Sequence, residues 1–232
     1  MKKIWITRAE PGASKTAARL RERGYEPLVA PLLTIEPAPK LNRDPSQYQA
    51  ILFTSANGVR AFASLNEARP RSLCVGDATA EAAQEAGFTD VESAAGDADD
   101  LLALSQRTLD PADGPILFAS GEHIAAKIHQ SLRKAGYSVD RSIVYRAAAA
   151  DSIPETAQEA IAAGEIDVVL FHSARAADAF TVIVPAQIAR LFRYVAISKN
   201  AAGPLFIPYE TAARPDEDSL LAALDRISRR AR

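Results

Sequence analysis

Two stretches of the chain recur further along the sequence with the same internal spacing. The segment Ile-Trp-Ile-Thr-Arg-Ala-Glu at 4–10 aligns with Ile-Leu-Phe-Ala-Ser-Gly-Glu at 116–122, and the same alignment sets Gly24 against Gly136. A second pair aligns 53–62 with 171–180, and each copy begins and ends on Phe. Self-similarity of this kind indicates that one supersecondary unit is used twice. The sequence therefore predicts two similar domains rather than one large one.

Short apolar runs alternate with helical patterns along the chain. The runs expected to be strands lie at 4–6, 27–33, 50–53, 72–75, 89–92, 115–118, 139–145, 167–171, 193–197 and 205–207. The helical patterns between them often end at a glycine, as at Gly24, Gly87 and Gly136, which is a common C-cap signal. Strands that alternate with helices form βαβ units with parallel strands. The predicted fold class is α/β, with two similar domains, each a roughly five-stranded parallel sheet flanked by helices, joined by a two-stranded linker.

The order of the repeats assigns segments of the chain to the two domains. The opening segment has its copy at 116–147, which closes the middle part of the chain. The economical interpretation is one inserted α/β domain at 40–147 and one discontinuous α/β domain made of 1–35 plus 150–232. The linkers are then 36–39, which prolines stiffen, and 148–150.

Composition limits the classes of protein to which the chain can belong. Its 232 residues are 48% hydrophobic, as in a globular chain. With 27 Lys and Arg against 29 Asp and Glu, the net charge of −2 argues against a general nucleic-acid or membrane-surface protein. The single cysteine, Cys74, cannot form an intrachain disulfide, which fits a reducing cytosol. No signal peptide and no apolar run of about 20 residues is found, so a cytoplasmic location is expected.

Small polar or basic residues follow nearly every predicted strand, directly before a helix. They include Thr7, Arg8, Thr54, Ser55, Asn57, Gly76, Thr79, Ser120, His172, Ser173 and Ser198. Taken singly, each hydroxyl is more simply a helix cap and each basic residue a solvated charge. Together they would line the carboxyl edge of a parallel sheet, where such folds bind ligands. Hydroxyls and helix N-termini at that edge would suit an anionic ligand.

Several familiar sites have no counterpart in the sequence. There is no Gly-x-Gly for a dinucleotide, no Gly-x-x-x-x-Gly-Lys phosphate loop, and no Gly-x-Ser-x-Gly around Ser55 or Ser173. The three histidines lack metal-binding spacing, and Cys74 and Trp5 fit the core. No cofactor and no metal is therefore expected. What is left is ligand binding, or a reaction controlled mainly by the conformation of a reactive substrate.

Short motifs in a fixed order span almost the whole chain. They are Ile-Thr-Arg-Ala-Glu-Pro at 6–11, Leu-Val-Ala-Pro-Leu-Leu-Thr-Ile-Glu-Pro at 28–37, Leu-Phe-Thr-Ser-Ala-Asn-Gly-Val at 52–59, Val-Gly-Asp-Ala-Thr-Ala at 75–80, Val-Tyr-Arg at 144–146 and Val-Val-Leu-Phe-His-Ser at 168–173. In this order they resemble the uroporphyrinogen-III synthase family. The resemblance implies a lyase that uses no cofactor and closes linear hydroxymethylbilane into uroporphyrinogen III in heme biosynthesis. Ring D is inverted and water is lost in that reaction.

The resemblance also implies roles for particular residues. Tyr145 would be the general acid that assists departure of the hydroxyl, since a phenol, with a reference pKa of about 10, suits donation. The alternative for Tyr145 is an aromatic side chain packed at a strand end. The groups that would hold the carboxylates of the substrate are Arg8, Thr54, Ser55, Asn57, Gly76, Thr79, Ser120, Ser173 and Ser198.

The segment Ser-Lys-Asn-Ala at 198–201 departs from the family, because Ala201 stands where a hydroxyl is expected. The departure leaves a second hypothesis open, a non-catalytic two-domain protein that binds a polycarboxylate or a tetrapyrrole. A nucleotide-dependent transferase is a third hypothesis, and the missing glycine loops count against it. The expected partner is a linear tetrapyrrole, with no nucleic acid and no membrane. The chain is expected to be a monomer in transient contact with the preceding enzyme of the pathway.

Overall fold

Contacts divide the chain into two units, each described here by itself. The computed structural model describes residues 3–38, 43–124 and 127–229. The terminal unit is Met1–Thr34 with Ala148–Arg232, and the central unit is Ile35–Ala147. We propose that these units correspond to the two predicted domains. The predicted change from linker to inserted domain, at residues 39 and 40, lies outside the described residues.

The terminal unit is built on a parallel sheet assembled from both ends of the chain. Its strands are β1 (Lys3–Ile6), β2 (Glu26–Val29), β9 (Ile166–Phe171), β10 (Arg193–Ala196) and β11 (Glu210–Thr211), in the order β11-β10-β9-β1-β2. All neighbours pair in parallel. The nearly continuous apolar run of β9 is typical of a parallel strand that is covered on both faces.

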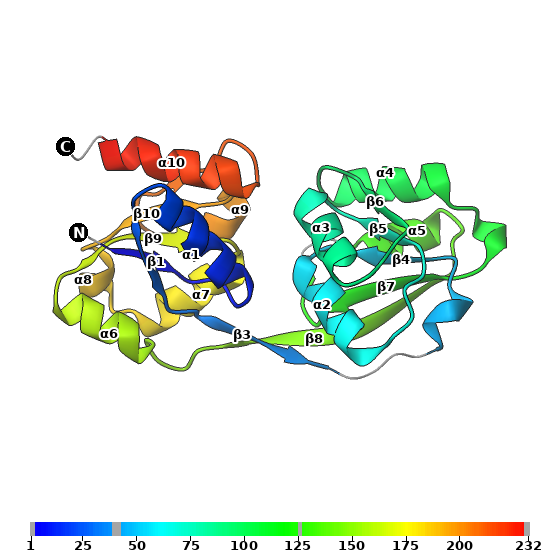
Figure 1. Cartoon of the computed structure of the whole chain (residues 1–232), viewed down its shortest axis with the longest axis horizontal. Coiled ribbons are helices and arrows are strands. Elements are labelled where there is room, and N and C mark those ends of the chain that lie inside the picture. The colour runs from blue at the N-terminus through cyan, green and yellow to red at the C-terminus, as the bar shows by residue number, and fades with distance from the viewer. Residues whose placement is uncertain (1–2, 39–42, 125–126, 230–232) are drawn as a thin grey trace. The chain divides into compact units, whose positions relative to one another are not determined.

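Helices cover both faces of this sheet (Figure 1). On one face lie α1 (Gly12–Glu22) and α10 (Glu217–Arg229), whose Leu20 and Leu224 pack against Ile6 of the sheet. On the other face lie α6 (Glu155–Ala162), α7 (Ala174–Ile183), α8 (Ala186–Ala189) and α9 (Lys199–Ala202). Trp5 and Phe180 lie at the centre of that second cluster, so the unit has three layers.

The central unit has a second sheet of the same kind. Its strands are β3 (Leu33–Pro37), β8 (Val139–Ala149), β7 (Ile116–Gly121), β4 (Ala50–Phe53), β5 (Ser72–Cys74) and β6 (Val91–Ser93), in that spatial order. The strands from β8 to β6 are parallel. At the edge, backbone bonds from Ala38 N to Val144 O and from Ala150 N to Leu32 O make β3 antiparallel to β8. These two strands carry the chain between the units.

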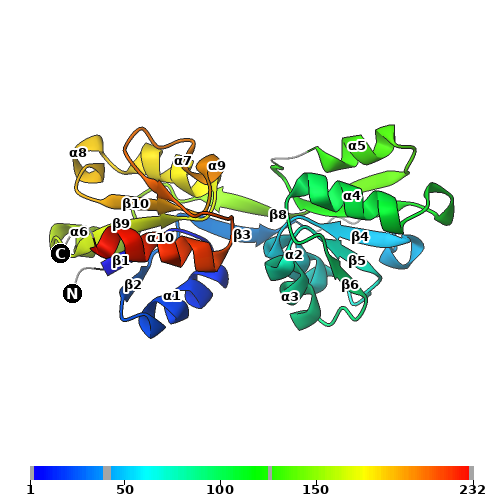
Figure 2. The ribbon, with the colours of Figure 1, turned by 90° about the horizontal axis from the view of Figure 1, so that it is seen from above.

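Helices also cover both faces of the central sheet (Figure 2). One side holds α2 (Ala56–Leu65) and α3 (Asp77–Glu85) around Phe53 and Phe62. The other side holds α4 (Ala98–Thr108) and α5 (Ile128–Lys134) around Leu52 and Phe118. Short 3-10 turns, Pro45–Gln47 and Pro111–Asp113, precede β4 and β7. The predicted α/β class, with parallel sheets flanked by helices, is confirmed.

The sequence repeats are also repeats of structure. Gly24 and Gly136 follow α1 and α5 with φ of 77° and 92°, a left-handed conformation that glycine adopts without steric cost. Phe62 and Phe180 occupy matching buried places in α2 and α7. The buried Trp5 and Cys74 lie in the core as predicted, and burial raises the pKa of the Cys74 thiol to about 12.

Two strand predictions are wrong. The run at 205–207 is not a strand, because Pro204 and Pro208 flank it and neither has an N–H for a ladder. The last strand of that sheet is β11 instead, and Phe206 is 96% exposed. The run at 27–33 is two strands in different sheets, since the chain leaves β2 before Pro31 and enters β3 after it.

Candidate active site

The carboxyl edge of the central sheet gathers residues that lie far apart in the sequence. β4, β5 and β7 run in the same direction, so Ser55 and Gly76, which follow β4 and β5, and Gly121, the last residue of β7, lie at one edge of the sheet. Thr54 and Asn57 lie on either side of Ser55 and are half-buried. Five of the predicted site residues thus belong to this edge: Thr54, Ser55, Asn57, Gly76 and Thr79.

Ser55 joins the edge of the sheet to the start of α2. Its backbone is extended, with φ −161°, and its Oγ accepts a hydrogen bond of 3.1 Å from the N–H of Gly58. This bond satisfies one of the backbone donors that the first turn of a helix leaves without an internal partner. The serine therefore has the capping role that its position in the sequence also allowed.

The hydroxyl of Tyr145 lies beside that cap. Its oxygen is 3.2 Å from Ser55 Oγ, and either hydroxyl could be the donor. Tyr145 comes from β8, is half-buried, and packs its ring against the apolar cluster under α2 and α3. A hydroxyl has one donor and two acceptor positions, so Ser55 can cap α2 and bind Tyr145 together. The structure thus brings the predicted acid to the predicted edge.

The start of α3 lies next along the same edge. Gly76 is its N-cap residue and provides no side-chain bond, while its carbonyl accepts from the N–H groups of Thr79 and Ala80. Thr79 is buried. Asp77 in the first turn is exposed and accepts a hydrogen bond from Ser93, so a carboxylate already lies near this helix N-terminus.

Ser120 differs from the other predicted residues of the central unit. It is only 2% exposed, and its hydroxyl accepts from Arg141 Nε at 3.0 Å and donates to Gly121 O at 3.1 Å. Both contacts lie within the β7–β8 pair. The Ser120 hydroxyl therefore holds the sheet together instead of facing a ligand.

The terminal unit has two serine caps at its own carboxyl edge. Ser173 Oγ accepts from Ala176 N at 3.3 Å at the start of α7, and Ser198 Oγ accepts from Ala201 N at 3.1 Å at the start of α9. Ala201 is 3% exposed, so the hydroxyl that is missing there leaves a small buried side chain. Both serines are half-buried.

A half-buried charged cluster lies beside Ser173. His172 Nε2 lies 3.1 Å from Glu217 Oε2, and the same carboxylate binds Arg8 Nη1 at 3.2 Å and Thr16 Oγ1 at 2.7 Å. Burial opposes its charge, yet the bonds from His172 and Thr16 and the nearby Arg8 lower the Glu217 pKa to about 2. Burial and Arg8 lower the pKa of His172, against the effect of Glu217. The sequence did not indicate Glu217, because it begins a helix far along the chain from Arg8.

A sequence model of one protein family matches residues 14–222, which reach into both units. That family is described as uroporphyrinogen-III synthase HemD. The chain belongs to this family. Its members are cyclising lyases of tetrapyrrole synthesis, so the predicted family, reaction class and place in heme biosynthesis are confirmed. The hypothesis of a non-catalytic binding protein is not favoured.

Solved structures of synthases share the fold of the chain. A uroporphyrinogen-III synthetase from Helicobacter pylori is 18% identical with a TM-score of 0.67, covering 98% of this chain and 100% of that one. A mutant uroporphyrinogen III synthase from Thermus thermophilus is 20% identical with a TM-score of 0.56, covering 99% and 100%. A search of the curated proteins finds no match.

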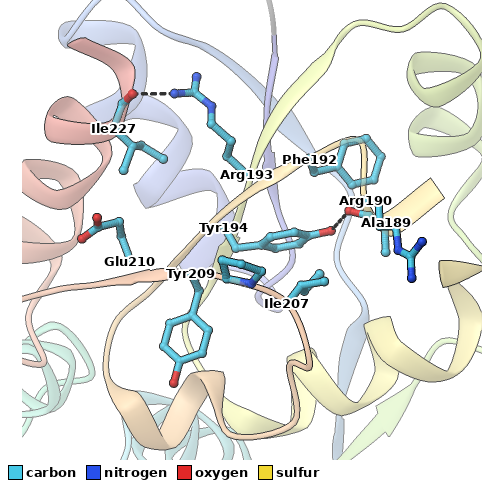
Figure 3. Close-up of a pocket in the computed structure, with 10 residues that line it drawn as sticks. Ala189, Arg190, Phe192, Arg193, Tyr194, Ile207, Tyr209, Glu210 and Ile227 are labelled. Atoms are coloured by element: carbon cyan, nitrogen blue, oxygen red, sulfur yellow. Dashed lines mark hydrogen bonds between the residues drawn. The ribbon is translucent and has the colours of Figure 1, made fainter. Parts of the chain in front are cut away.

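This synthase also has a cavity away from the predicted residues. About 370 Å³ in volume, it lies in the terminal unit at the start of β10 and is lined by Phe192, Tyr194, Ile207 and Tyr209, among others. Figure 3 shows Tyr194 directed toward Ala189, whose carbonyl its hydroxyl binds, and Tyr209 turned away from Tyr194. The cavity contains none of the predicted site residues, and no sequence motif indicated it.

The described residues contain no candidate metal centre and no candidate membrane-spanning helix. Within 3–38, 43–124 and 127–229, no three side chains of His, Cys, Asp or Glu gather as a metal site would require. Across the same residues, no helix is both long enough and apolar enough to span a bilayer.

Proposed function

We propose that this synthase closes hydroxymethylbilane at the carboxyl edge of its central sheet, with Tyr145 as the acid for the departing hydroxyl. The observation that carries the proposal is the 3.2 Å contact between the Tyr145 hydroxyl and Ser55 Oγ. A neutral phenol is both a proton donor and an acceptor, so Tyr145 can hold the leaving oxygen and supply its proton. Ser55 remains as a partner for the phenolic oxygen.

Besides this proton donor, the proposed reaction needs the protein mainly to orient the substrate. As the carbon–oxygen bond of the hydroxymethyl group breaks, the phenolic proton passes to the oxygen and water leaves. The reactive azafulvene then closes through the spiro intermediate that the family resemblance implies, and a proton released from the substrate returns to the phenolate. A well-placed proton donor contributes about 10²- to 10⁴-fold to the rate. Orientation of the reactive chain supplies the selectivity for the inverted ring.

We further propose that the starts of α2 and α3 bind carboxylates of the substrate. Thr54, Ser55, Asn57, Gly76 and Thr79 lie at these two helix N-termini, whose partial positive charge favours anions. Ser120 is left out of this set, because its buried hydroxyl is bound to Arg141 and Gly121.

For the terminal unit, we propose Ser173, Ser198 and Arg8 as carboxylate contacts. The two serines cap helices at the edge of the sheet. The Arg8 side chain is 34% exposed while it binds Glu217, so part of its guanidinium can face a ligand. An arginine that already binds a protein carboxylate offers a weaker contact than one without that neighbour.

We also propose that the chain acts as a monomer in the cytoplasm and makes transient contact with the enzyme that supplies its substrate. Hydroxymethylbilane closes to the I isomer without an enzyme, so a short path between the two proteins would limit that loss. The near-neutral net charge of −2 is consistent with a free protein, because it does not favour polyanions or membrane surfaces.

The isomer of the product tests the proposed function. Freshly made hydroxymethylbilane is mixed with the protein, and the uroporphyrinogens are separated after oxidation. We expect the III isomer in large excess over the I isomer that forms without enzyme. A product that contains only the I isomer would show that the chain is no synthase.

A further inference from the structure

Gly121 is where the ring of Tyr145 comes closest to strand β7. A Cβ placed on Gly121 would lie 2.7 Å from Tyr145 Cζ and 2.9 Å from its hydroxyl oxygen. Outside its own residue and its chain neighbours, a Cβ atom essentially never lies within 3.0 Å of another heavy atom. Even alanine at this position would therefore have to displace either the ring or the strand. The obstacle is the Tyr145 ring, which fills the space that a side chain at position 121 would need.

A shift in strand pairing aims Tyr145 at this space. β7 and β8 pair in a constant register from Ile116 opposite Val139 as far as Ser120 opposite Ile143. The register then shifts, and Gly121 lies opposite Tyr145. An extra residue in one strand, as in a β-bulge, turns the following side chains from their regular directions. Beyond the shift, a backbone bond of 3.0 Å from Glu122 N to Tyr145 O closes the ladder again.

Arg141 fixes the end of β7 beside the ring. Its Nη2 donates to Gly121 O at 2.8 Å and to Glu122 O at 2.6 Å, and its Nε donates to Ser120 Oγ at 3.0 Å. A guanidinium is a planar fork with fixed donor directions, so these bonds hold the backbone at 120–122 in one position. The strand cannot easily move away to make room for a side chain at position 121.

We propose that Gly121 is a positioning residue for the reaction: its missing side chain lets the phenol of Tyr145 lie across β7 and reach Ser55. This inference rests on the proposed role of Tyr145 as the proton donor. Gly121 itself touches no reacting atom. It acts through the ring, which the fixed strand supports from below.

Kinetics of Gly121→Ala test the proposal through the split between kcat and KM. A catalytic group misplaced by about 1 Å can cost about 10²-fold in rate. We expect kcat to fall by about that factor, toward the value of Tyr145→Phe, with KM changed by less than about twofold. The matched control is Ser142→Ala, which removes a buried hydroxyl of β8 that has no partner among the described residues, and should keep full kcat. A Gly121→Ala enzyme with wild-type kcat would overturn the proposal.

A second measurement is independent of catalysis. Urea unfolding midpoints are compared for the wild type, Gly121→Ala, Tyr145→Ala and the double variant. We expect Gly121→Ala to lower the midpoint in the wild type and to leave it unchanged in Tyr145→Ala, where the ring is gone. Equal losses in both backgrounds would show that the ring does not fill the space above Gly121. If the wild type makes no III isomer, the proposed function fails, while this cycle still decides the placement of Tyr145.

Discussion

The starts of α2 and α7 are two copies of one structural unit with different surroundings. Each follows a buried strand, and each is capped by a serine whose φ is close to −160°. In the central unit, the capping Ser55 also meets the hydroxyl of Tyr145. In the terminal unit, the residue before Ser173 is His172, which binds the carboxylate that also holds Arg8.

Under the proposed function, this difference separates the edge that supplies the proton from the edge that only binds carboxylates of the substrate. The central copy presents two hydroxyls in hydrogen-bond contact, and each of them can both donate and accept. The terminal copy binds its charged groups to each other, which joins α10 to the strand ends of β1 and β9. A capped helix start therefore does not decide function. The side chain that reaches the cap from another strand or helix does.

Removing the charge of Glu217 should give the largest change in stability. A folded pKa of about 2, against an ordinary value of 4.5, corresponds to on the order of 3 kcal/mol at neutral pH. We expect Glu217→Gln to lower the free energy of unfolding by on the order of this amount in urea titrations at pH 7. Asp218→Asn, at an exposed neighbour in the same helix turn, is the matched control and should change it by less than about 0.5 kcal/mol.

The same carboxylate predicts a pH dependence. The folded pKa of Glu217 lies below the unfolded one, so its stabilisation is complete above about pH 4.5 and is lost as the pH falls toward about 2. The lowered pKa of His172 acts in the same direction, starting below about pH 6.5. In Glu217→Gln, the loss of stability between about pH 4.5 and pH 2 should be absent. An unchanged profile in that variant would mean that the cluster does not hold the terminal unit together.

The two capping serines provide a direct comparison between the units. Ser55→Ala and Ser173→Ala each remove a side-chain N-cap, so each should lose about 1 kcal/mol of stability. Only Ser55→Ala also removes the partner of Tyr145, and we expect its kcat to fall by about tenfold. For Ser173→Ala we expect a change in KM and not in kcat. Equal losses of kcat in the two variants would mean that the central and terminal edges contribute alike to the chemical step.

Some contacts of the site could be predicted from the local sequence, and others could not. A serine between an apolar strand and a helix predicts an N-cap hydrogen bond, because that bond joins residues only three positions apart. Contacts such as Arg8 with Glu217 join positions at opposite ends of the chain, so local pattern carries no information about them. Ser120 followed the same local rule as Ser55 and yet is buried under Arg141, which arrives from the next strand.

A third, smaller comparison concerns the helix starts at Gly76 and Ser198. Gly76→Ser should give α3 the side-chain cap that Ser198 gives α9, and its Cβ has room, since its nearest neighbour would be Gly96 O at 3.7 Å. We expect a gain of a few tenths of a kcal/mol in stability, about the difference between the two cap residues. If the start of α3 binds a carboxylate, the new hydroxyl competes for its N–H groups and KM rises, by about twofold. An unchanged KM would remove α3 from the proposed site.

Most of the fold could be predicted because the buried parallel strands carry continuous apolar runs and the helices end on glycine. The errors arose at prolines. Pro31 divides one apolar run between two sheets, and Pro204 and Pro208 keep a short run out of any sheet. An apolar run alone cannot tell a strand from a buried loop, since both bury side chains such as Leu205.

The most direct test of the account compares Tyr145→Phe with Tyr137→Phe by product analysis and kcat. Both lose one hydroxyl in the central unit, but Tyr137 donates to Leu109 O within the core. We predict that Tyr145→Phe lowers kcat for the III isomer by about 10²- to 10⁴-fold while substrate still binds. Tyr137→Phe should keep kcat and lose about 1 kcal/mol of stability. A Tyr145→Phe enzyme that makes the III isomer at the wild-type rate would contradict the central claim.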